Sequence, residues 1–247
     1  MKKIALSLLI ASCLLTPYGF SQDYTQEEYQ QIFQDGDQQK QQLALESLIL
    51  SGLSDPSLFD MIEAKLNASL PLATKKHPIE YSSWLAKGLG YSGNDKYRAS
   101  LQAIVNGDYH KKLRKYAQEG LKNLDQFAIW NPILNDQSQY DAMQPQQLNV
   151  LANALASNDL ELKRMAAKHI AAKRVYAEFI LEKLASQLTS LDLLKQDKLS
   201  IDTYAWIAKA LASSGNEKFK PVIAHLAETA PEKKLRKYAA KYIKSYY

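Results

Sequence analysis

The heptapeptide KKLRKYA occurs twice in the chain, at Lys111–Ala117 and again at Lys233–Ala239, 122 positions later. The match extends without gaps, so that Trp84–Leu124 aligns on Trp206–Tyr246 with 16 identities in 41 positions. Several of the remaining pairs are conservative. A long internal match at one fixed spacing predicts two copies of one structural unit.

The match also reaches toward the N-terminus, where Leu43-Ala44 pairs with Met165-Ala166 at the same spacing of 122. We therefore predict a first unit over residues 37–124 and a duplicate second unit over 159–247. Residues 125–158 form a connecting segment, and we expect all three parts to make one continuous domain.

Apolar residues within the units recur at helical spacing, as in Leu58, Phe59, Ile62, Leu66 and Leu70. Residues 62–66 fit residues 180–184 best at a spacing of 118, which predicts that four residues have moved between two loops. No run of alternating β-branched residues suggests a strand. The sequence therefore predicts an all-α protein of about twelve helices.

Several short motifs predict where helices begin and end. Thr25-Gln26-Glu27-Glu28 has the form of a capping box, and Asp55-Pro56 is a favourable helix start. Ser92-Gly93-Asn94 and its counterpart Ser214-Gly215-Asn216 predict turns in which Gly ends one helix and Asn caps the next. The Gln-rich segment 22–36 either forms a short capping helix or acts as a flexible tether.

Three segments share an aliphatic residue, a basic residue, an alanine and a second aliphatic residue in the same order. They begin at Leu113, Leu162 and Leu235, and the second carries Lys163 where the other two have Arg. This pattern resembles the first helix of the HEAT-repeat family. The resemblance implies a right-handed α-solenoid of stacked antiparallel helical hairpins over roughly residues 37–246, and says little about function because such solenoids have many functions.

The first 21 residues have the form of an export signal. Lys2 and Lys3 precede a twelve-residue apolar stretch that is too short to span a bilayer, and small residues stand at positions 19 and 21. Cleavage after Ser21 would remove the single cysteine, Cys13, and leave no disulfide. We expect a periplasmic protein, with a lipoprotein anchored at Cys13 as the minor alternative.

The sequence contains no recognisable catalytic, metal or cofactor motif. The four histidines lack ligand spacing, and no His-Glu dipeptide occurs, so the metal motif of hydroxylases with the HEAT fold is missing. We expect no cofactor, no metal and no catalytic residues, and predict that the protein is not an enzyme. The alternative is an envelope enzyme with a loop-built site within 125–145, formed by Phe127, Trp130, Asp136, Tyr140 and Asp141.

The helices that contain the repeated heptapeptide each gather basic residues on one side. A solvated helix face explains such a cluster, and a surface for an anionic partner is the alternative. The candidate residues are Lys111, Lys112, Arg114, Lys115 and Lys122 in the first helix, and Lys233, Lys234, Arg236, Lys237, Lys241 and Lys244 in the second.

Tyr238, Tyr242 and Tyr246 form a stripe at four-residue spacing in the last helix. At two of these positions the first unit has Gly120 and Leu124. Tyrosines there either cover the end of the core or form a docking edge for a partner.

These features favour a non-catalytic periplasmic scaffold or adaptor that binds another protein. A binder of anionic envelope polymers is the further alternative. Nucleic acid is an unfavoured partner, because the net charge is only +5, of which two charges lie in the export signal. No second segment is long and apolar enough to span a membrane.

Overall fold

The computed structural model describes residues 24–247, so the predicted signal peptide and Cys13 lie outside the described residues. Residues 24–247 contain twelve α-helices joined by turns and short 3₁₀ segments, and no strand, which confirms the all-α prediction. The helices are α1 (Gln26–Asp35), α2 (Gln38–Ser47), α3 (Pro56–Ser69), α4 (Lys76–Leu89), α5 (Arg98–Asn106), α6 (Lys111–Leu134), α7 (Gln146–Ala156), α8 (Leu160–Lys173), α9 (Glu178–Ser190), α10 (Lys198–Ala212), α11 (Lys220–Thr229) and α12 (Lys233–Tyr246). Within this described range, none of the helices combines the length and the apolar character that crossing a membrane requires.

Polar side chains and a glycine set the helix ends where the sequence motifs predict them. Thr25 and Glu28 form the capping box of α1, and Asp55 caps α3 directly before Pro56. Asn94 and Asn216 each accept a hydrogen bond from the backbone two residues later. Gly93 adopts the left-handed region with φ of 61°, where an added Cβ would also lie 2.5 Å from the backbone of Phe127.

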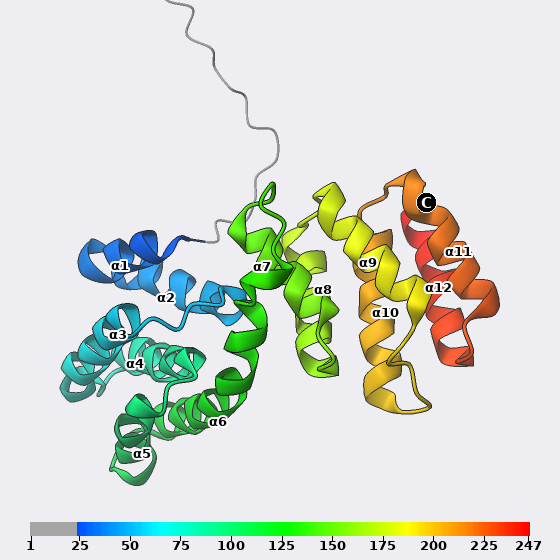
Figure 1. Ribbon diagram of the computed structural model, residues 1–247. Helices are drawn as coiled ribbons and strands as arrows, with labels where there is room; N and C mark the ends of the chain where they lie inside the picture. The colour runs from blue at the N-terminus through cyan, green and yellow to red at the C-terminus, as the bar shows by residue number, and fades with distance from the viewer. Residues whose placement is uncertain (1–23) are drawn as a thin grey trace, which may run out of the picture.

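The helices pack as two layers along the chain (Figure 1). One layer runs through α2, α4 and α6 and continues through α8, α10 and α12, each helix packing against the next of its group. The other helices cover this layer, as α3 covers α4, α5 covers α6, and α11 covers α12. In Figure 1, α8 to α12 stand side by side as a stack, which is the arrangement of an α-solenoid.

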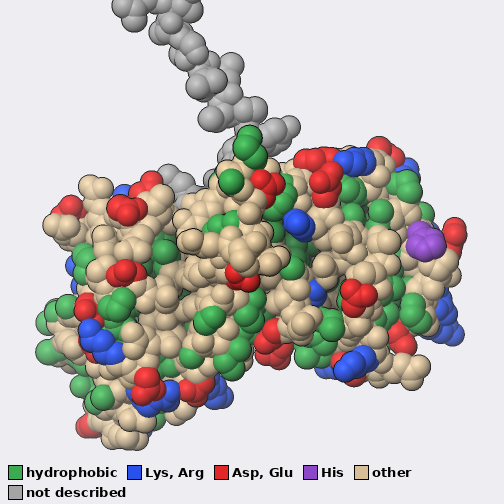
Figure 2. Space-filling model, viewed as in Figure 1, with side chains coloured by type: hydrophobic (Ala, Val, Ile, Leu, Met, Phe, Trp, Pro, Cys, Tyr) green, Lys and Arg blue, Asp and Glu red, His purple; other side chains and the backbone are tan. Residues whose placement is uncertain are grey.

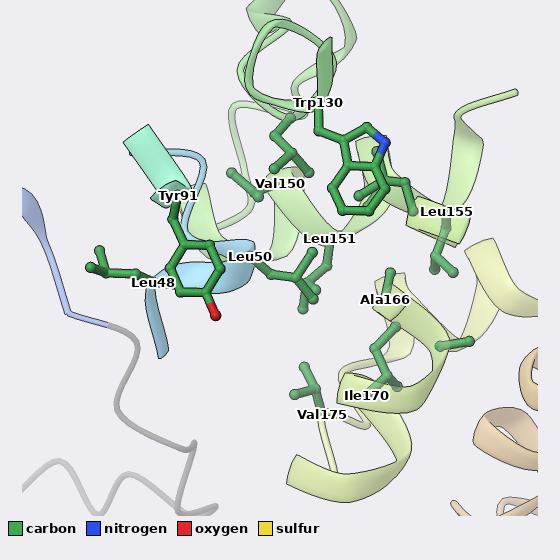
Figure 3. Packing of buried hydrophobic residues seen from close by; sticks show 14 of the residues in the cluster. Leu48, Leu50, Tyr91, Trp130, Val150, Leu151, Leu155, Ala166, Ile170 and Val175 are labelled. Carbon is green, nitrogen blue, oxygen red and sulfur yellow. The ribbon is translucent and has the colours of Figure 1, made fainter. Parts of the chain in front are cut away.

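One hydrophobic core runs through both units and the segment between them. Figure 3 shows Leu48 and Tyr91 of the first unit together with Val150 of α7 and Ile170 of α8. The predicted end of the first unit at residue 124 does not coincide with a helix end, because α6 continues to Leu134. The connecting segment thus consists of the last part of α6, a loop and α7.

Corresponding helices of the two units begin 122 residues apart, including α3 at Pro56 and α9 at Glu178. Their buried apolar positions also match at 122, with Leu58, Phe59, Ile62 and Leu66 opposite Ile180, Leu181, Leu184 and Leu188. The predicted spacing of 118 in this region is therefore wrong. A shift of four residues is close to one helical turn, so it preserves the apolar stripe and is hard to recognise from sequence.

The repeated heptapeptide contributes Leu113 and Ala117, and Leu235 and Ala239, to the core in equivalent places. Tyr116 and Tyr238, the tyrosines of the heptapeptide, are half-buried. The apolar residues four positions after each alanine are also half-buried. The small alanines let neighbouring helices approach closely, which explains why the heptapeptide is retained in both units.

Lys163, which stands where the other two segments of the repeat pattern have Arg, is a buried cation. Its side chain is 2% exposed and its Nζ donates to the carbonyl oxygen of Leu155 and to Oε1 of Gln187. Burial lowers the pKa of Lys163 to about 8, against a smaller opposing effect of Asp192. The first unit carries the neutral Gln41 at this position, where its Nε2 donates to the carbonyl oxygens of Ile32 and Gly36.

We predict that Lys163→Gln changes the pH dependence of stability. The folded protein loses the Lys163 proton near pH 8 and the unfolded chain loses it near 10.5. Between these values the unfolded chain binds more protons, so the contribution of Lys163 to the wild-type free energy of unfolding increases as pH rises. The variant lacks this increase. At about 1.4 kcal/mol per pKa unit, the increase in the free energy of unfolding is at most about 3 kcal/mol. Urea unfolding of both proteins at pH 7 to 10 measures the difference. A difference that does not vary with pH would contradict a buried Lys163.

Candidate functional site

In the first unit, aromatic and basic side chains of α4 and α6 form a cluster in which the rings are in contact and the lysine has an ion-pair partner. The rings of Trp84 and Tyr116 meet edge to face with centroids 5.7 Å apart. Lys87 places its Nζ 5.7 Å from each centroid and 3.1 Å from the carboxylate of Glu119. The Trp84 Nε1 is buried and finds no acceptor within residues 24–247, so neighbouring groups cover this edge of the half-buried ring.

The equivalent cluster on α8, α10 and α12 keeps the tryptophan and changes the charges around it. The Nζ atoms of Lys168 and Lys209 lie 5.1 and 4.5 Å from the ring centroid of Trp206. Lys241 stands where the first unit has the carboxylate of Glu119. Across the described chain, no carboxylate lies within ion-pair distance of any of these three lysines.

Trp206 and Lys209 border two adjoining hollows, which we call together the Trp206 groove. The first has a cavity volume of about 900 Å³ and is lined by Lys168, Ala171, Ala172, Arg174, Tyr176, Trp206, Lys209, Ser213, Ser214 and Tyr246. The second has a volume of about 300 Å³ and is lined by Asp202, Ala205, Trp206, Lys209, Tyr238, Lys241, Tyr242, Ser245 and Tyr246. The groove therefore crosses three consecutive helices of one layer.

The cluster on α4 and α6 differs from the one on α10 and α12 because the first has glycines where the two helices meet. A Cβ on Gly90 would lie 2.3 Å from the Gly120 carbonyl oxygen, and one on Gly120 would lie 2.5 Å from that of Ala86. The second unit has Ala212 and Tyr242 at the positions of these glycines. Helices α10 and α12 therefore cannot approach each other as closely as α4 and α6 do, and Tyr242 lines the resulting groove.

The tyrosine stripe, for which covering the core and forming a docking edge were the two alternatives, packs against the core and forms a wall of this groove. Tyr238 and Tyr242 stack with centroids 6.2 Å apart and planes 15° apart, and Tyr246 lies 6.3 Å from Tyr242. All three are half-buried, and burial raises the pKa of Tyr242 to about 12. The stripe thus faces Trp206 across the groove.

Arg174 adds a further cation to the groove from an unfavourable backbone conformation. It ends α8 in the left-handed region with φ of 56°, which residues other than glycine seldom adopt. The first unit has Gly52 at this position, with φ of 71°. An arginine thus replaces the residue that the backbone favours, and its side chain lines the groove.

The acidic residue in the groove, Asp202, does not compensate these cations. Its carboxylate accepts a charged hydrogen bond of 3.1 Å from Arg164 of α8. At the four aligned positions that carry the groove cations, the first unit has a net charge of −1, from Glu46, Gly52, Lys87 and Glu119. The second unit has +4, from Lys168, Arg174, Lys209 and Lys241. The groove is therefore a concentration of unpaired positive charge next to aromatic rings.

The predicted basic faces do not form one surface. Lys112 pairs with Glu80 at 2.8 Å, and Lys115 lies 3.9 Å from Glu119. Arg236 donates to the carbonyl oxygens of Ala230 and Pro231 and thereby caps α11. Lys241 lines the groove, and Lys234 lies 6.0 Å from the Tyr238 ring beside it.

The other predicted basic residues are exposed on their helices: Lys111, Arg114, Lys122, Lys233, Lys237 and Lys244. On the face of the molecule shown in Figure 2, basic and acidic side chains alternate without forming a large patch of one charge. Sequence reasoning missed Lys168, Arg174 and Lys209. Comparing charges between the two units at aligned positions would have identified the first two.

The side chains proposed for a loop-built enzyme site are engaged in structural contacts. Phe127 and Trp130 are buried, and the Trp130 Nε1 donates to Asp159 at 2.8 Å. Asp136 and Asp141 accept hydrogen bonds from nearby backbone amides, and the Tyr140 hydroxyl donates to the Leu134 carbonyl oxygen. Within the described range, no three His, Cys, Asp or Glu side chains gather in a way that could hold a metal ion.

Comparison of the sequence with models of known protein families finds no match. Comparison with curated proteins finds none either. Among solved structures, human deoxyhypusine hydroxylase in complex with glycerol is similar to this chain, with 13% sequence identity and a TM-score of 0.36 over 89% of this chain and 83% of that one. The resemblance to the HEAT family thus stands without a matching family model, and what the structure shows is an all-helical solenoid.

This comparison corrects one expectation. The prediction that the protein is not an enzyme is contradicted, because the similar structure is a hydroxylase. At 13% identity and a TM-score of 0.36, the likeness assigns no activity to this chain either.

Proposed function

We propose that this protein is a scaffold or adaptor that binds another protein through the Trp206 groove. The observation that carries the proposal is the set of cations without an ion-pair partner around the half-buried Trp206, at positions where the first unit has the Lys87–Glu119 ion pair. Holding like charges together without counter-charges is unfavourable. A partner that brings carboxylates to the groove removes this cost, so charge complementarity favours an acidic partner.

The chemistry of the groove favours a protein over an anionic polymer. Tryptophan, tyrosine and arginine are the residues most enriched at the energetic centres of protein interfaces, and the groove contains all three. A linear polyanion binds best along an extended track of positive charge. In the groove, the cations without an ion-pair partner lie next to aromatic rings, whereas two of the basic residues on α6 are paired with carboxylates.

We also propose that the protein works in the periplasm. The support is the basic start, the short apolar stretch and the small residues before Gln22 in the sequence. A scaffold in that compartment would meet envelope proteins as partners. The twelve-helix solenoid provides an elongated surface for such an interaction.

The first prediction of this proposal exchanges charges between the units. Lys168→Glu with Lys241→Glu introduces the residue type that the first unit has at both positions. The new carboxylate at 241 can pair with Lys209 as Glu119 pairs with Lys87, so we expect unchanged thermal stability. Crosslinking in producing cells followed by mass spectrometry should show loss of the partner that the wild type captures.

The matched control is Lys233→Glu with Lys237→Glu, which changes the net charge equally at exposed positions of α12 outside the groove. It should capture the same partner as the wild type. Equal capture by the groove variant and the wild type would overturn the proposed function.

A second prediction concerns Arg174. Arg174→Gly removes the unfavourable left-handed arginine, so the free energy of unfolding should rise by about 1 kcal/mol, while partner capture should weaken because a cation is lost. Arg174→Lys keeps both the charge and the conformation and should match the wild type in both measurements. Lower stability of the glycine variant would contradict this reading of the site.

A third prediction concerns export. If the signal is cleaved, mass spectrometry of the protein isolated from the cells that make it should find Gln22 as the first residue. An intact Met1 would reject export by this signal. A lipid-modified Cys13 at the N-terminus would instead identify a lipoprotein.

A further inference from the structure

The groove cations are arranged as a row across the helices. Lys168 belongs to α8, Lys209 to α10 and Lys241 to α12, and these helices pack against one another in this order. Trp206 lies beside Lys168 and Lys209 and also borders the hollow that Lys241 lines. A ligand that contacts all three lysines must therefore run across the helices and pass over the tryptophan.

The spacing of the row follows from helix packing. Axes of packed helices are about 8–10 Å apart, so three successive cations span roughly 16–20 Å. An extended peptide in the polyproline II conformation advances about 3.1 Å per residue and brings every third side chain to the same side. One helix-to-helix step therefore corresponds to about three residues of such a peptide, and the whole row to a segment of about seven residues.

The size of the groove favours an extended segment over a helix. A helix with its side chains is about 10 Å wide, and the two hollows have volumes of about 900 and 300 Å³. An extended segment is narrower than a helix and leaves the aromatic walls free to contact its side chains.

The walls of the groove indicate what lies between the acidic residues of such a segment. Tyr246 borders both hollows together with Trp206. Tyr176 is held in place because its hydroxyl donates to the Ser213 hydroxyl at 3.0 Å. Apolar or aromatic side chains of the ligand would pack on these rings while its carboxylates meet the lysines.

We propose that the Trp206 groove binds an extended segment of the partner protein in which acidic side chains recur at every third residue, with apolar or aromatic side chains between them. This inference rests on the proposed function and specifies its ligand. It assigns Lys168, Lys209 and Lys241 to successive carboxylates, and Trp206 to an apolar side chain next to the central one.

Fluorescein-labelled nine-residue peptides of equal composition test this inference by fluorescence anisotropy with the purified protein. One peptide has Glu at positions 2, 5 and 8 and Phe at 3 and 6, and a second has its three Glu residues adjacent. We expect the spaced peptide to bind at least tenfold more tightly, with an affinity that falls as salt rises. K168E/K241E should lose at least tenfold of this affinity, and K233E/K237E should stay within twofold of the wild type.

Equal affinity for the spaced and the adjacent peptide would overturn the inference, because the groove would then attract negative charge without register. Tighter binding of a helix-forming peptide with Glu seven residues apart would overturn the extended conformation. If no peptide binds while K168E/K241E still loses the crosslinked partner, the peptide inference fails and the proposed function stands. If K168E/K241E captures the partner like the wild type, both fail.

Discussion

The rest of the structure depends on how closely paired helices pack, α4 against α6 in the first unit and α10 against α12 in the second. Gly90 and Gly120 bring α4 and α6 so close that no Cβ fits at either position. This contact holds Trp84, Tyr116 and Lys87 together as a closed cluster. Ala212 and Tyr242 occupy the same positions in the second unit, and there Trp206 and Tyr242 line a hollow between the helices.

The sequence was sufficient to predict the helices, because apolar spacing, capping residues and Ser-Gly-Asn turns act within a few residues of one another. It was not sufficient to align α3 with α9, since one turn of a helix preserves the apolar stripe. The groove could not be predicted from shared residues at all. It arises from Tyr242, Lys168 and Lys241, which are residues that the two units do not share.

The basic faces show why charge on one helix is a weak guide to a binding surface. Lys112 and Lys234 are aligned, yet Lys112 pairs with Glu80 while Lys234 lies beside an aromatic ring. Whether a lysine is compensated depends on a neighbouring helix some thirty residues away in sequence, as with Lys87 and Glu119. Exposed ion pairs contribute little free energy, so their main effect here is to remove cations from the set available to a ligand.

The two units differ in how favourable their residues are for stability at aligned positions. The first unit has favourable choices at aligned positions, with Gly52 in the left-handed region and Gln41 as a neutral buried group. The second has Arg174 and Lys163 there, of which one is conformationally unfavourable and the other is a buried cation. Such costs persist where the surrounding structure can support them. The continuous core that joins both units through α7 supplies that support, and it lets the second unit keep an open, charged groove on a fold that its neighbour helps to hold.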